Sequence, residues 1–250
     1  PLDTLRRRPH WSYSRINSLV HHCQLQWAFR YVYGEEPLFT PSSLVFGSVF
    51  HQVLAFLFSR RARGEDTRAE SGAELLRDLL HDALLRTEPE VKLGKGESER
   101  SMADCGCRMV AAFLESLDPG EEILSIGVPF SVPLTASDGQ RAGKPLIGEF
   151  DMVVRRNGVR TIVDWKTAAR RWPADRARSD LQPTCYLYAD SRGGAREAEF
   201  RFDVVTKAKT PVCECHPARR DIDDFDRLVQ TVRNLERFVR TDAFIPRDGS

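Results

Sequence analysis

Apolar residues recur at helical spacing through the first half of the chain. From Ser14 to about Tyr33 they predict one helix, with Ser12 or Ser14 placed to cap its start. A second helix is expected after Pro41-Ser42-Ser43, and two more over Ala73–Arg86 and Glu99–Leu117, with a polar loop at Glu65–Gly72 before them. The apolar positions of the first helix are Ile16, Leu19, Val20, Cys23, Trp27 and Tyr31.

The hydrophobic period changes after Pro119-Gly120. Short segments rich in β-branched and aromatic residues, bounded by Gly, Pro or Asn, then predict strands. A helix from about Ala177 to Asp190 is expected before the last strand, and a final helix from about Ile222 to Val239. The predicted strands are Glu122–Leu134, Leu146–Arg156, Val159–Lys166 and Glu199–Lys207.

This order of elements, helices followed by β-β-β-α-β-α, is typical of an α/β or α+β protein. We expect a single domain over residues 1–250. Residues 1–118 form its mainly helical part, and residues 119–250 form the sheet core with a C-terminal helix.

Composition adds little that is unusual. The 250 residues are 41% hydrophobic and 29% charged, with a formal net charge of +1, as in ordinary globular proteins. This charge excludes a polycation, so any nucleic-acid contact must come from local basic clusters. The most apolar stretch, Ser42 to Phe58, is shorter than the roughly 20 residues of a spanning helix. With no signal-peptide pattern at the start, we expect a cytoplasmic protein without a membrane partner.

The six cysteines include two close pairs. Both pairs, Cys105 with Cys107 and Cys213 with Cys215, are C-x-C and not the C-x-x-C of zinc ribbons. Cys213, Cys215 and His216 could bind zinc, but one such cluster supplies too few ligands for a closed site. We therefore favour free thiols and keep zinc as an alternative.

The pair Asn157-Gly158 predicts a tight β-hairpin, because both turn positions need positive φ. A two-residue turn pairs Arg156 with Val159. The same register sets Asp151 opposite Asp164, and Glu149 opposite Lys166. Opposed residues share a face with Cβ atoms about 4.5–5.5 Å apart. Two facing carboxylates repel each other unless something such as a divalent cation offsets the repulsion.

A plainer interpretation of the hairpin is a solvated sheet face with a Glu149–Lys166 ion pair, which adds little stability. Val153 and Ile162 lie on the same predicted face as the charged residues, so we expect that face to be partly covered. Charges against a covered face favour a functional site.

Five sequence blocks resemble the PD-(D/E)XK nuclease superfamily, specifically its RecB-type exonuclease branch. The resemblance implies a restriction-endonuclease-like fold, with a mixed central sheet flanked by helices and an N-terminal helical region. The blocks are Ser12-Tyr13-Ser14-Arg15-Ile16 with Cys23 and Phe29-Arg30-Tyr31, Gly47-Ser48-Val49-Phe50-His51, Gly148-Glu149-Phe150-Asp151, Val163-Asp164-Trp165-Lys166-Thr167, and Gln182-Pro183-Thr184-Cys185-Tyr186.

The resemblance also implies roles for individual residues. Asp151 and Asp164, helped by His51 and the backbone carbonyl of Trp165, would hold one or two Mg²⁺ or Mn²⁺ ions, which prefer oxygen ligands. Lys166 would orient or help deprotonate the attacking water, or stabilise the transition state. A lone His on an apolar helix is more often a core residue, but the resembling block favours the ligand role for His51.

Gln182 and Tyr186 are four residues apart and hence on one helix face. The resemblance implies that this face braces the site and contacts DNA, although packing and hydrogen bonding alone would explain both residues. A basic group close after Lys166 is the best candidate for nucleic-acid contact, with an aromatic ring that could stack on a base. It consists of Arg170, Arg171, Trp172, Arg176 and Arg178.

Many relatives of this type carry an iron–sulfur cluster bound by one N-terminal and three C-terminal cysteines. Cys23 matches the first of these, but no cysteine follows the last predicted helix, so we expect no cluster in this chain. The sequence also lacks the G-x-x-x-x-G-K-[ST] phosphate loop of a motor, so unwinding would need a helicase or another repair protein as partner.

These patterns predict a metal-dependent DNA nuclease, an exonuclease on single-stranded or end-containing DNA in repair or recombination. The alternative is a non-catalytic nucleic-acid-binding or scaffold module of a larger helicase–nuclease complex. A broken Asp…Asp-x-Lys set would mark that alternative, and here the set is complete.

Overall fold

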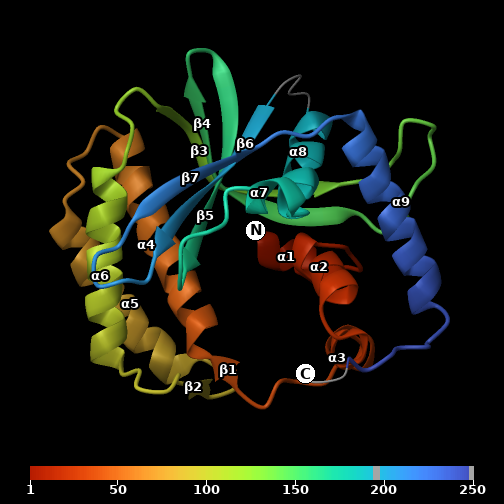
Figure 1. The fold of residues 1–250 in the computed structure, drawn as a ribbon, viewed down its shortest axis with the longest axis horizontal. Coiled ribbons are helices and arrows are strands. Elements are labelled where there is room, and N and C mark those ends of the chain that lie inside the picture. Colours follow the sequence, from red (N-terminus) through yellow and green to blue (C-terminus); the bar gives the residue numbers. More distant parts are fainter. Residues whose placement is uncertain (194–197, 248–250) are drawn as a thin grey trace.

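A five-stranded mixed sheet lies at the centre of the computed structural model, which describes residues 1–193 and 198–247 (Figure 1). The strand order is β3-β4-β5-β6-β7; the β5–β6 pair is parallel and the other neighbours are antiparallel. The strands are β3 (Glu122–Val132), β4 (Leu146–Arg156), β5 (Val159–Ala168), β6 (Ala198–Thr206) and β7 (Cys213–Ala218).

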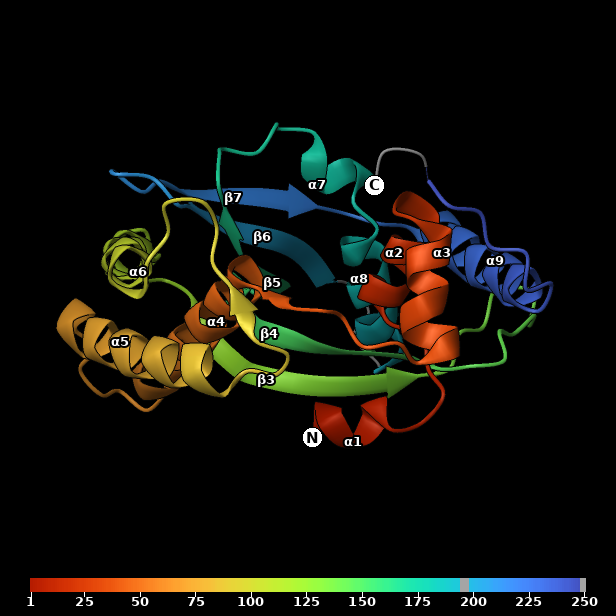
Figure 2. The same ribbon diagram turned by 90° about the horizontal axis from the view of Figure 1, so that it is seen from below.

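Helices cover both faces of this sheet. Viewed from below, α5 and α6 lie at one end of the molecule, and α2, α3 and α9 lie at the other (Figure 2). Helices α5 (Ala69–Arg86) and α6 (Glu99–Glu115) form one group with α4 (Ser42–Ala62). The others are α1 (Leu2–Arg6), α2 (Tyr13–His21), α3 (Gln24–Ala28), the π-helical turn η1 (Phe29–Tyr33), α7 (Arg176–Ser179), α8 (Gln182–Arg192) and α9 (Ile222–Val239). A small parallel sheet joins β1 (Thr40–Pro41) to β2 (Val91–Lys92).

Alternation along β4 and β5 divides the core between the two faces of the sheet. Met152 and Val163 pack in the cluster that contains α4, α5 and α6, whereas Val153 and Ile162 pack with Leu187 of α8. Successive strand residues point to opposite faces, so each strand supplies both layers. The expected covered face around Val153 and Ile162 is confirmed, because both side chains are fully buried.

The central helix α4 is long and apolar enough to cross a membrane by length and composition. Its most apolar window has a mean hydropathy of 1.5, and 50% of that window is buried inside the protein. Its buried residues pack against the sheet and the two neighbouring helices, which is the usual reason for a helix that is apolar on most sides.

The predicted hairpin is confirmed in its turn and register. Asn157 and Gly158 have φ values of 50° and 80°, and the pairs run from Arg156–Val159 to Met152–Val163. The fold class predicted from the sequence is also confirmed: the sheet is mixed and flanked by helices, as in restriction-endonuclease-like folds.

Several predicted boundaries are wrong. The helix expected from Ser14 to Tyr33 is interrupted, because His22 is extended and Cys23 starts a new helix. The loop expected up to Gly72 ends sooner, since α5 begins at Ala69. A Cβ on Gly72 would lie 2.9 Å from side-chain atoms of Leu57 and Val110, so this glycine allows close helix packing and does not mark a loop.

Two further differences concern the second half of the chain. The helix expected from Ala177 to Asp190 is divided into α7 and α8, and Asp180 Oδ1 accepts a hydrogen bond from Gln182 N at the break. Strand β7 was not predicted. It is an edge strand that contains Pro217, and proline within a strand weakens the sequence signal although edges tolerate it.

Candidate active site

The site lies where β4 and β5 separate. Their ladder ends at Met152–Val163, one position before Asp151 and Asp164 would face each other. The strands are still close there, because Asp151 Oδ2 accepts a hydrogen bond of 2.9 Å from Trp165 N. The predicted pairing of Glu149 with Lys166 is wrong, because the β4–β5 ladder does not extend past Met152–Val163 to these positions.

Both aspartates open into one pocket of about 830 Å³. Its acidic wall carries Glu149, Asp151 and Asp164, and Lys166, Gln182 and Tyr186 also line it. Residues of α4 line it, and so do residues of α2 and of the η1 turn. The five residues predicted as catalytic are therefore brought to a single cavity.

His51 reaches this pocket from α4. Its Nδ1 lies 3.5 Å from Asp151 Oδ2, and its ring meets the Trp165 indole edge-on with centroids 6.0 Å apart. Burial lowers the pKa of His51, but the hydrogen bond and charge of Asp151 raise it by more, so the net direction is upward. Burial raises the pKa of Asp151, but the hydrogen bond and charge of His51 lower it, and the net direction is downward.

Asp164 is the most buried carboxylate of the site, with 2% of the residue exposed. Gln182 Nε2 donates a short hydrogen bond to its Oδ1, and Lys166 Nζ forms a close ion pair with its Oδ2. Burial raises the pKa of Asp164 to about 6; the charge of Lys166 opposes this rise and that of Asp151 adds to it.

Tyr186 lies one turn after Gln182 on α8. Its ring packs against Phe130, Phe150 and Phe200 with centroids 5.7, 5.7 and 5.9 Å away. Burial raises the pKa of this phenol, which therefore stays neutral. The residue therefore packs in the core at the edge of the pocket.

The donors in this pocket fit a hard divalent cation in chemistry, since they include two carboxylates, an amide oxygen and an imidazole. Gln182 Oε1 is buried without a hydrogen-bond partner, and a cation would satisfy such an acceptor. In the part of the chain that the structure describes, no three His, Cys, Asp or Glu side chains stand close enough to hold a metal as they are arranged. Asp151 faces His51 and the Trp165 amide, whereas Asp164 faces Gln182 and Lys166.

The indole of Trp165 belongs to the core. It is 1% exposed and stacks on Phe58 with centroids 5.4 Å apart. Only its backbone is close to the aspartates, as the hydrogen bond from Trp165 N to Asp151 shows.

The predicted nucleic-acid-binding group lies outside this pocket. Arg171 Nε is 3.1 Å from Glu214 Oε1, and the Arg176 guanidinium lies 3.9 Å from the centre of the Trp172 ring. The ring also packs edge-on against Phe202, with centroids 5.1 Å apart. None of Arg170, Arg171, Trp172, Arg176 and Arg178 lines the pocket.

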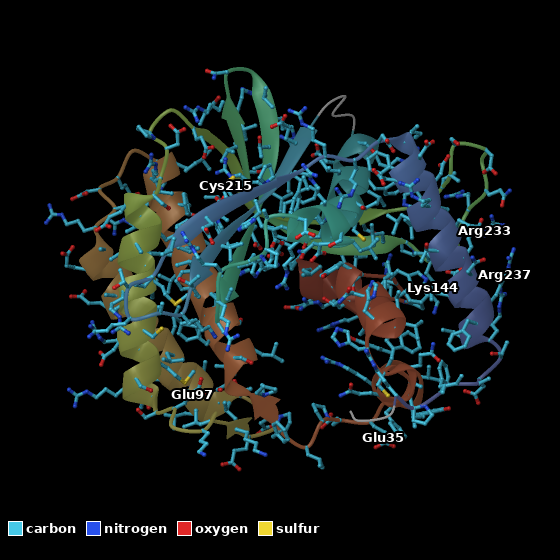
Figure 3. The ribbon with its side chains drawn as sticks, viewed as in Figure 1. Glu35, Glu97, Lys144, Cys215, Arg233 and Arg237 are labelled. Carbon is cyan, nitrogen blue, oxygen red and sulfur yellow. The ribbon has the colours of Figure 1, made fainter. Side chains whose placement is uncertain are left out.

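The residues considered for zinc, Cys213, Cys215 and His216, do not all lie on one face of β7. Cys213 and Cys215 alternate with His216 along β7, so the histidine points to the opposite face. Cys215 is labelled on β7 in Figure 3, while the buried His216 packs against Trp172. Cys23 lies at the start of α3, and its Sγ accepts a hydrogen bond of 3.4 Å from Arg247 N.

Sequence analysis assigned no site role to several residues that line the pocket. Ser48 and Gln52 line it from the same side of α4 as His51, and their polar spacing within an apolar helix is a signal that could have found them. Arg15, Arg30 and Tyr31 line it from α2 and η1, where the resembling blocks contain them without suggesting a role.

Comparison with known proteins agrees with this fold. A mixed five-stranded sheet flanked by helices is consistent with the restriction-endonuclease-like class of folds. The family model of the PD-(D/E)XK nuclease superfamily matches residues 10–249, and the chain belongs to that superfamily.

Solved structures support the fold. A protein from Eubacterium rectale that is proposed to be an exonuclease is 14% identical, with a TM-score of 0.54 over 96% of this chain and 84% of that chain. A second structure, SSO0001, has 11% identity and a TM-score of 0.33 over 85% of this chain and 82% of that chain, too low to add support. No curated protein sequence matches this chain significantly.

Proposed function

We propose that this chain is a divalent-metal-dependent DNA nuclease that hydrolyses phosphodiester bonds. The observation that carries the proposal is the shared pocket of Asp151, Asp164 and Lys166, with His51 and Gln182 held against the two carboxylates. We further propose an exonuclease that acts in the cytoplasm on single-stranded or end-containing DNA during repair or recombination, with a helicase or another repair protein as partner.

PD-(D/E)XK nucleases generally use divalent metal ions. Asp151 and Asp164 would hold Mg²⁺ or Mn²⁺ in this chain, helped by His51 and the Trp165 carbonyl. When bound, such an ion lowers the pKa of a water molecule and neutralises charge that grows on the phosphate.

The protein's own groups would position the reactants. Lys166 is held by Asp164 beside the face of Phe202, 5.5 Å from its centroid, where an ammonium group can orient water or stabilise negative charge on the phosphate. Gln182 holds the Asp164 carboxylate through its hydrogen bond to Oδ1. His51 holds Asp151 on the opposite side.

End-labelled single-stranded and duplex DNA, incubated with and without Mn²⁺, tests this proposal. We expect Asp164→Ala and Lys166→Ala each to reduce metal-dependent cleavage by at least about 100-fold. Asp78→Ala and Lys95→Ala are matched controls on exposed positions outside the pocket and should cleave normally. Retained cleavage in the Asp164 and Lys166 variants would contradict the assignment.

Circular single-stranded DNA tests the exonuclease part of the proposal. An exonuclease leaves the circle intact and degrades its linear form. DNA binding without any metal-stimulated cleavage would instead support the non-catalytic module.

A further inference from the structure

The wall of the pocket made by α2 and η1 carries two arginines around one aromatic ring. The Arg15 guanidinium lies 4.7 Å from the centre of the Tyr31 ring, and the Arg30 guanidinium lies 5.4 Å from it. All three side chains line the same pocket as Asp151 and Asp164. The two cations are thus collected at one place by stacking on a shared ring.

Arg15 is held in place by its surroundings. Its Nη1 donates to the His10 carbonyl at 3.1 Å, and its own carbonyl accepts a bond of 2.9 Å from the Trp27 indole. Trp27 also packs against Tyr31, with ring centroids 5.4 Å apart. One bond to His10 leaves most of the five guanidinium donors available for a ligand.

Neither arginine has an acidic partner within residues 1–193 and 198–247. Arg15 is half-buried, and this burial lowers its pKa, with the neighbouring Arg30 charge adding to the effect. Two positive groups that share one ring repel each other, so the arrangement favours an anion between them. By contrast, the nearby Arg6 is paired with Asp3, at 3.2 Å.

The backbone that presents Tyr31 and Arg30 is a π-helical turn that continues α3. Such turns are rare and frequently occur at functional sites. Here the turn carries both residues to the pocket.

We propose that Arg15 and Arg30 form a phosphate-binding site, in which Tyr31 fixes both guanidinium groups and a phosphate of single-stranded DNA next to the cleaved one is bound. Guanidinium groups bind phosphate through paired hydrogen bonds. A pocket of about 830 Å³ has the size of a small-ligand site, which suits one strand and not a duplex. This inference rests on the proposed nuclease function and specifies its substrate.

Binding of fluorescently labelled oligothymidylate in chelating buffer, over a series of salt concentrations, tests the site without cleavage. Arg30→Met is the primary variant, because Arg30 is exposed and the variant should fold normally. For Arg30→Met and Arg15→Met we expect about 10-fold weaker binding each, and a salt slope that is smaller by about 0.7 per lost phosphate contact. Arg77→Met, an exposed position on α5 outside the pocket, makes the same charge change and should keep the wild-type slope.

Arg30→Met with the affinity and salt slope of Arg77→Met would overturn the phosphate site. An equal effect of Arg30→Met on a duplex of the same length would overturn the single-strand assignment. Because no metal is present, these failures are distinguishable from a failure of the nuclease proposal, which is decided by cleavage in the Asp164→Ala variant.

Discussion

At the scale of single residues, burial makes the ionised form of Asp164 unfavourable in the metal-free protein. It is almost fully buried, and burial raises its pKa from 3.8 to about 6. The folded state therefore binds this proton more tightly than the unfolded state. As a result, the carboxylate lowers stability progressively as the pH rises from about 4 to about 6, and the loss is complete above that range.

Asp164→Asn should remove this pH-dependent loss. In chelating buffer at neutral pH we expect the variant to be about 1–3 kcal/mol more stable than the wild type, and this advantage to disappear near pH 4. Urea unfolding at several pH values measures the difference. Adding Mn²⁺ should raise the Tm of the wild type and leave that of the variant unchanged. If the difference in stability between the variant and the wild type were the same at neutral pH and near pH 4, the burial effect would be contradicted.

Two glycines near the site should respond oppositely to alanine. A Cβ on Gly148 would lie 2.5 Å from Cζ of Phe130, a ring that packs against Tyr186, so Gly148→Ala should cost about 1–3 kcal/mol through overpacking. Gly47 in α4 has open space around its Cβ position, and Gly47→Ala should stabilise the helix by about 0.5–1 kcal/mol. Denaturant unfolding of both variants measures the signs, and a harmless Gly148→Ala would show that the Phe130 ring can move away.

At the scale of elements, the position of α8 depends on an arginine that lies far from the catalytic residues in sequence. Arg220 Nη2 donates to the carbonyl oxygens of Ala177, Arg178 and Asp180 at 3.1, 3.0 and 2.8 Å. Its Nε donates to Thr184 Oγ1 at 2.8 Å. One guanidinium group thus joins α7 to the first turn of α8, where Gln182 meets Asp164.

Arg220→Met should therefore weaken both stability and catalysis. We expect a loss of about 2–4 kcal/mol in the free energy of unfolding, because the carbonyl oxygens lose charge-assisted bonds. Arg219→Met is the matched control: its side chain is exposed and pairs with Glu199 at the surface, so the change should cost less than about 0.5 kcal/mol. Equal Tm values for the two variants would show that Arg220 does not hold α8.

At the scale of the whole molecule, the helical part and the sheet share one core. Leu80 of α5 and Met109 of α6 belong to the same buried cluster as Val163 and Trp165 of β5. Glu97, which is labelled in Figure 3, accepts a hydrogen bond of 2.6 Å from the hydroxyl of Ser42, the first residue of α4. These contacts favour unfolding of the chain as one unit.

Leu80→Ala tests this cooperativity. The leucine is fully buried, so the change should cost about 2–5 kcal/mol. We expect one transition in which tryptophan fluorescence and far-ultraviolet circular dichroism coincide and shift together. Two separate transitions, with only the first shifted, would mean that residues 1–118 unfold apart from the sheet and would contradict the single-domain prediction.

Local chemistry explains which predictions succeeded. The turn at Asn157-Gly158 requires positive φ and fixes the register of β4 and β5, and the final helix has the predicted bounds Ile222–Val239. The predictions that failed depended on distant contacts. Gly72 indicates a loop by composition, but it lies inside α5 because two other helices approach it closely.

Local patterns specify the class of fold, the hairpin and the residue types that can perform phosphodiester chemistry, because turn geometry and side-chain alternation act between near neighbours. Long-range packing specifies where β4 and β5 separate, that Asp151 turns to His51 while Asp164 turns to Gln182, and that Arg15, Tyr31 and Arg30 complete the opposite wall. The contact of His51 with Asp151 joins residues 100 positions apart, and no local rule of spacing or propensity specifies it.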